Sequence, residues 1–69
     1  MRIRLREVRL AKLLTQEEVA RRAGLSEATV NRIETGTHEA RISTVRKLAV
    51  ALEVEATELI VASDGKVGA

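Results

Sequence analysis

The chain has 69 residues, with no cysteine, no aromatic residue and a formal net charge of +2 at pH 7. A chain of this length forms one small domain that buries only about 60% of its unfolded surface, so we expect no separate ligand-binding domain. The composition excludes disulfides and thiolate metal sites and argues against single-strand binding by base stacking, while duplex DNA stays open as a partner.

A first helix is predicted from about Ile3 to Lys12. Its inward residues are Leu5, Val8 and either Leu10 or Ala11. Up to Arg32 the chain has eight basic and four acidic residues, a net charge of +4, whereas the remainder has a net charge of −2. A phosphate-binding surface is therefore expected in the first half.

The second predicted helix runs from about Gln16 to Ala23. Thr15 and Glu18 have the spacing of a capping box, in which each side chain bonds the other residue's backbone N–H. Gly24 follows the last periodic residue and is suited to end the helix in a left-handed conformation. The apolar stripe of this helix contains Val19, Ala20 and Ala23.

Ser26 is a good N-cap for a third helix that Gly36 ends. Val30 and Ile33 form its inward face. Because Ala20 is small where the two helices cross, the third helix can pack closely on the second and project into a major groove. Its outward residues are Glu27, Ala28, Thr29, Asn31 and Arg32.

Two further helices complete an all-α prediction. The fourth runs from about Ile42 to Leu52, and its apolar stripe contains Val45, Leu48, Ala49 and Leu52. The fifth lies near Ala56 to Val61 and presents Leu59 and Ile60. We expect one domain over residues 1–62 and a flexible C-terminal tail over residues 63–69.

The segments LTQEEVARRAGLS and TVNRIETG resemble the Cro/C1-type helix-turn-helix family, also called the XRE family. The likeness extends from about Leu5 to Ile60. It implies a compact five-helix, lambda-repressor-like domain with the helix-turn-helix at residues 16–35. It also implies a dimer on paired DNA half-sites whose third helices read the bases.

The base-reading candidates are the outward residues of the third helix, Glu27, Ala28, Thr29, Asn31 and Arg32. Arg32 is the strongest candidate, because its planar fork suits guanine or a phosphate. Glu27 could accept from cytosine, but it equally suits a helix N-terminus without DNA. Asn31 points farther round the helix and is a weaker candidate.

The phosphate-binding candidates are Thr15, Gln16, Ser26, Thr37 and His38. Gln16 begins the second helix, where free backbone N–H groups favour an anion; the alternative is an exposed helix former. A pure phosphate contact predicts that Gln16→Ala weakens binding to all DNA sequences alike. For His38, a phosphate contact or plain exposure is expected, and no metal.

The resemblance further implies a partly buried ion pair between Arg9 and Glu34 that fixes the angle of the reading helix. Leu13 and Glu53 each stand where the family usually has glycine, and its usual proline near Ala40 is missing.

Leu10 stands at a position where the family usually has a polar residue. We expect it to share one side of the first helix with Leu13 and Ile3. Three interpretations of this apolar patch stay open: a dimer interface, a docking site for another protein, or core.

The sequence favours a sequence-specific DNA-binding regulator, and the resemblance implies that it is a dimer. The expected mechanism is repression by steric occlusion of polymerase, with recruitment of polymerase as a less common alternative. The alternative is an antitoxin-like or bridging module that docks a protein partner through the side of Leu10 and Leu13. No residues are spaced to activate a nucleophile, so we expect no enzyme, and no cofactor or metal. A charged N-terminus and the lack of a long apolar run predict no signal peptide, no membrane partner and a cytoplasmic location.

Overall fold

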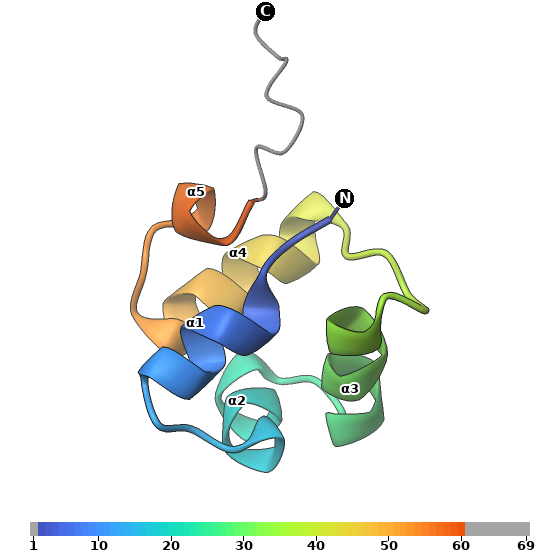
Figure 1. Ribbon diagram of the computed structural model, residues 1–69, viewed down its shortest axis with the longest axis horizontal. Coiled ribbons are helices and arrows are strands. Elements are labelled where there is room, and N and C mark those ends of the chain that lie inside the picture. The colour runs from blue at the N-terminus through green and yellow to red at the C-terminus, as the bar shows by residue number, and fades with distance from the viewer. Residues whose placement is uncertain (1, 61–69) are drawn as a thin grey trace, which may run out of the picture.

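The computed structural model describes residues 2–60 and contains five helices in that range, which confirms the all-α prediction (Figure 1). They are α1 (Leu5–Ala11), α2 (Gln16–Ala23), α3 (Glu27–Thr35), α4 (Ile42–Leu52) and α5 (Ala56–Leu59). None of these helices has both the length and the apolar character needed to cross a membrane.

Local hydrogen bonds explain where α2 begins and ends. The Thr15 hydroxyl accepts from the Glu18 backbone N–H over 3.0 Å, and the Glu18 carboxylate accepts from the Thr15 N–H over 2.8 Å. This is the predicted capping box, and it supplies acceptors for N–H groups that the helix leaves free. Gly24 ends the helix with φ 73°, a conformation that costs glycine little.

A side-chain N-cap and a left-handed glycine also set the two ends of α3. The Ser26 hydroxyl accepts from the Thr29 backbone N–H over 3.1 Å, and Gly36 ends the helix with φ 84°. The observed bounds of α2, α3 and also α4 agree with the predicted ones.

One apolar core holds the five helices together. Helix α2 packs on both α3 and α4, α1 packs on α3, and α5 packs on α4 (Figure 1). Each helix contributes at least one fully or nearly fully buried residue, and the most buried large side chains are Leu5, Val19, Val30, Leu48, Leu52 and Leu59.

The prediction that the first helix starts at Ile3 was wrong. Ile3 instead forms an antiparallel β-bridge with Ile60, and the Arg4 backbone N–H donates to the Leu59 carbonyl over 2.8 Å. This contact joins the two ends of the described chain, so a local periodicity could not reveal it. Helix α1 consequently begins at Leu5.

Helix α5 is shorter than predicted, because Ile60 is already extended, with φ −76° and ψ 130°. Val61, the last residue of the predicted helix, and the tail at 63–69 lie outside the described residues.

Two residues other than glycine adopt left-handed backbone conformations. Leu13 has φ 58° in the turn after α1, and Glu53 has φ 59° at the end of α4. Both stand where the resembling family usually has glycine. The chain therefore keeps the turns and tolerates the steric cost of a side chain there.

Candidate DNA-binding surface

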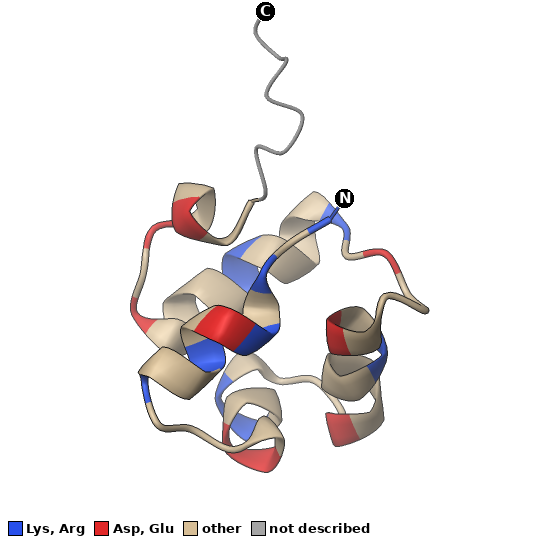
Figure 2. Cartoon of the chain, in the orientation of Figure 1, with Lys and Arg blue, Asp and Glu red and all other residues tan. Residues whose placement is uncertain are grey.

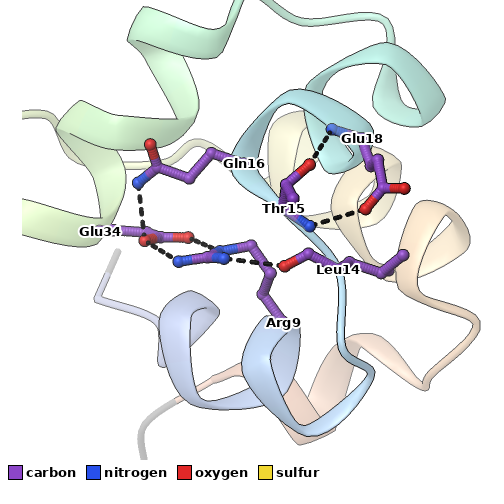
Figure 3. Close-up of polar contacts among 6 residues, drawn as sticks. All are labelled: Arg9, Leu14, Thr15, Gln16, Glu18 and Glu34. Atoms are coloured by element: carbon purple, nitrogen blue, oxygen red, sulfur yellow. Dashed lines mark hydrogen bonds and ion pairs between the residues drawn. The ribbon is translucent and has the colours of Figure 1, made fainter.

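A partly buried ion pair joins α1 to α3 (Figure 3). The Arg9 guanidinium donates to both Glu34 carboxylate oxygens, Nε to Oε2 over 2.6 Å and Nη2 to Oε1 over 3.0 Å. Its Nη1 donates to the Leu14 carbonyl over 2.8 Å. The expected pair between Arg9 and Glu34 is thus present, and its side chains are only 10% and 3% exposed.

The surroundings of this pair keep both of its groups charged. Burial disfavours ionisation of Glu34, but hydrogen bonds from Arg9 and Gln16, and the positive charges of Arg9 and Arg6, outweigh it and lower the pKa of that carboxyl. The hydrogen bond to Glu34 likewise outweighs burial and raises the pKa of Arg9. The pair therefore links α1 and α3 through charged hydrogen bonds, and we call it the polar joint.

Gln16 belongs to the same network, which the sequence did not predict. Its Nε2 donates to Glu34 Oε1 over 2.9 Å, and its side chain is half-buried (Figure 3). The two residues are 18 positions apart. Only the crossing of α2 and α3 brings them together, so no local motif could have indicated the contact.

The outward face of α3 presents most of the base-reading candidates. Val30 and Ile33 are buried on the inner side of the helix. Exposed on the other side are Glu27, Ala28, Asn31 and Arg32.

Thr29 differs from the other candidates because it is half-buried and its Oγ1 accepts from the Ser26 hydroxyl over 2.9 Å. Its hydroxyl is thus already committed as an acceptor within the cap of α3.

The phosphate-binding candidates lie at the start of α2 and at both ends of α3. Thr15 and Ser26 are exposed N-caps. Thr37 and His38 are exposed in the turn after α3, where both backbone N–H groups donate to the Arg32 carbonyl, over 3.0 and 3.2 Å. Exposed polar groups therefore flank α3 on two sides, an arrangement suited to a groove bordered by two DNA backbones.

Charge is unevenly distributed over the molecule (Figure 2). Both signs occur on α3, whereas α5 and the segment before it have only acidic residues among their charges. Arg6 is exposed, and its charge reaches Glu34 near the end of α3. Sequence reasoning counted Arg6 only toward the total charge, because its position relative to α3 depends on the fold.

The apolar patch expected on one side of α1 is only partly present. Leu10 is 49% exposed and Leu13 is 91% exposed. Ile3 is instead half-buried, packs against the core and does not belong to the helix, so its expected place in the patch was wrong. The exposed part of the patch therefore reduces to Leu10 and Leu13.

Comparisons with known proteins agree with this arrangement. The sequence model of the family described as Helix-turn-helix matches residues 5–59. A similar solved structure is the restriction-modification controller protein C.AhdI from Aeromonas hydrophila, with 42% sequence identity and a TM-score of 0.80, covering 83% of this chain and 86% of that one. A search of curated proteins gave no match.

Proposed function

The chain belongs to the Cro/C1-type helix-turn-helix family of DNA-binding transcriptional regulators, and we propose that it recognises a specific duplex sequence by placing α3 in the major groove. The two faces of α3 carry this proposal. Val30 and Ile33 anchor the helix in the core, while Asn31 and Arg32 remain exposed on its other side. A helix held in this way presents side chains that can reach base edges.

Within α3, Arg32 is the proposed principal base contact, because a guanidinium can donate two parallel hydrogen bonds to guanine O6 and N7. Ala28 offers a methyl group to thymine. Glu27 either accepts from cytosine or only stabilises the helix N-terminus.

The proposed phosphate contacts lie beside this reading face. Gln16, half-buried at the start of α2, and His38, exposed after α3, are our proposed contacts to the two backbones that border the groove. These contacts would set the position of α3 along the duplex without reading its sequence.

We further propose that two copies bind paired half-sites about 34 Å apart and repress transcription by occluding polymerase. The proposed location is the cytoplasm. The family resemblance supports the dimer. The similarity to a restriction-modification controller protein supports a regulatory role without giving its sign.

Exposed leucines favour a second candidate, a module that docks a protein partner. Leu13 is almost fully exposed although its backbone has φ 58°. A large apolar side chain in such a conformation contributes little to folding, so a binding role would account for it. The two functions are compatible in one chain, since α3 and this turn are different surfaces.

Selection of bound duplexes from a random pool, at two salt concentrations, tests the proposal. We expect the unmodified protein to select an inverted repeat and Arg32→Ala to lose the preference at one position of each half-site. Sequence-blind binding that depends only on salt, or no binding, would contradict the regulator and favour the protein-docking candidate.

A further inference from the structure

The hydroxyl groups of Ser26 and Thr29 form a short hydrogen-bond chain at the start of α3. Ser26 Oγ accepts from the Thr29 backbone N–H over 3.1 Å and donates to Thr29 Oγ1 over 2.9 Å. A hydroxyl has one hydrogen to donate, and the hydrogen of Ser26 is used in this chain. The chain therefore has one direction, from Ser26 to Thr29.

Thr29 is left with a hydroxyl hydrogen that has no acceptor within residues 2–60. Its side chain is half-buried, whereas Ser26 before it and Ala28 beside it are exposed. Because a hydroxyl that accepts a hydrogen bond is polarised by it, that hydroxyl becomes a stronger donor. Thr29 therefore offers a directed O–H donor to a partner outside the protein.

The location of Thr29 fits a base contact. It is the third residue of α3, beside exposed Ala28 and one turn before Arg32. When a recognition helix lies in a major groove, the residues at its N-terminal end contact the base edges. An unconstrained threonine hydroxyl can donate to a base or accept from one, so it distinguishes bases poorly. The chain from Ser26 removes this ambiguity.

Resting on the proposed function, we propose that Thr29 is a specificity-determining residue whose hydroxyl donates to the N7 atom of a purine. N7 is the major-groove acceptor that guanine and adenine share, whereas cytosine presents an amino donor there. An amino group facing Thr29 would leave the hydroxyl hydrogen without an acceptor, which is unfavourable in a closed interface. Ser26 is the positioning residue, because its hydroxyl sets the direction of the Thr29 donor.

Two substitutions separate the hydroxyl from the rest of the Thr29 side chain. Thr29→Val keeps the branched shape and the methyl group but has no hydroxyl, whereas Thr29→Ser keeps the hydroxyl and has no methyl group. In selections from a random duplex pool, Thr29→Val should lose the preference at one position of each half-site, and Thr29→Ser should keep it. Loss of that preference by Thr29→Ser, or its retention by Thr29→Val, would overturn the inference.

A modified base tests the acceptor atom with the unmodified protein, so this measurement does not depend on a variant's folding. In a 7-deazapurine, a carbon replaces N7 and base pairing is retained. Placed at the identified position, it should lower the affinity of the unmodified protein about three- to tenfold, the effect of one lost hydrogen bond. Thr29→Val should bind both duplexes equally. An unmodified protein that is insensitive to the analogue would refute the contact with N7.

Ser26→Asp tests the direction of the chain. Aspartate remains a good N-cap, but its carboxylate only accepts hydrogen bonds, so the Thr29 hydroxyl should turn toward it. The added negative charge weakens binding to every duplex. The separate effect of the 7-deazapurine should disappear in this variant, and its persistence would refute the positioning role of Ser26.

The outcomes separate this inference from the proposed function. If the unmodified protein selects no sequence, the proposed function fails and the inference fails with it. If it selects a sequence, and Thr29→Val with an unchanged circular dichroism spectrum selects the same one, the regulator stands and the reading role of Thr29 is refuted.

Discussion

Glu34 is the carboxylate on which three helices converge. It belongs to α3 and accepts two hydrogen bonds from Arg9 of α1 and one from Gln16 of α2. A buried charge with this many donors is stabilised only while all partners remain in place. The fold therefore depends at this point on a complete network, whereas most of the core depends on apolar contact.

Removing Glu34 alone should be costly. Glu34→Ala leaves the Arg9 charge buried with only the Leu14 carbonyl, so we expect the free energy of unfolding to fall by about 3 kcal/mol or more. The paired replacement Arg9→Met with Glu34→Leu should recover most of that loss, because it removes both charges from the interior. Urea unfolding of the three proteins measures both effects, and a double variant as unstable as the single one would contradict this account.

Acid should weaken the same joint. The pKa of Glu34 is lowered in the folded protein from its ordinary value of 4.5. The pair's contribution is therefore fully present above pH 4.5 and is lost as the pH falls through the lowered, folded-state value. Unfolding midpoints measured from pH 6 to pH 3 should decline less steeply for Glu34→Gln than for the unmodified protein. Equal declines would place the acid sensitivity in other groups.

Helix ends, more than helix interiors, show where local sequence determines the structure. Thr15, Ser26, Gly24 and Gly36 predicted the bounds of α2 and α3 because each cap involves residues at most four positions apart. The predicted start of α1 was wrong because Ile3 pairs with a residue at the far end of the described chain.

The same distinction applies to the candidate site. The outward residues of α3 followed from helical spacing alone. The bond between Gln16 and Glu34 required the crossing geometry of two helices, and the pairing of Arg9 with Glu34 was expected only through a family resemblance. Interactions distant in sequence are thus the part that spacing could not predict.

The turn after α1 offers a test at this scale. Leu13 has φ 58° and is almost fully exposed, so Leu13→Gly should relieve backbone strain without removing buried surface. We expect the free energy of unfolding to rise by up to about 1 kcal/mol. Lys12→Gly is the matched control. Because Lys12 has φ −93°, glycine relieves no strain there and only makes the unfolded chain more flexible, so this variant should be less stable than the unmodified protein. A decrease for both variants would show that Leu13 makes a stabilising contribution.

At the scale of the whole molecule, the net charge is small, but the charge is unevenly distributed along the chain. The part of the chain up to Arg32 contains all of α2 and most of α3 and has a net charge of +4, whereas the rest of the chain has a net charge of −2. We therefore expect the positively charged part of the chain to face the duplex during association.

Proposed pairing of two copies predicts a strict spacing between half-sites. Inserting about 5 base pairs, half of a helical turn, between the selected half-sites should place the second half-site on the opposite side of the duplex. Affinity should then fall to that of a single half-site, whereas inserting about 10 base pairs should cost less. Gel-shift titrations on the three duplexes provide the measurement, and identical affinities would contradict binding as a fixed dimer.

The bridge between Ile3 and Ile60 also has a consequence for the order of folding. It closes a loop that spans nearly the entire described chain, and forming it early would cost more chain entropy than any contact within the helix-turn-helix. We therefore expect it to form after the rate-limiting step. Weakening it with Ile3→Ala should accelerate unfolding and leave the refolding rate nearly unchanged, so the two ends of the fold would control how long the native state lasts.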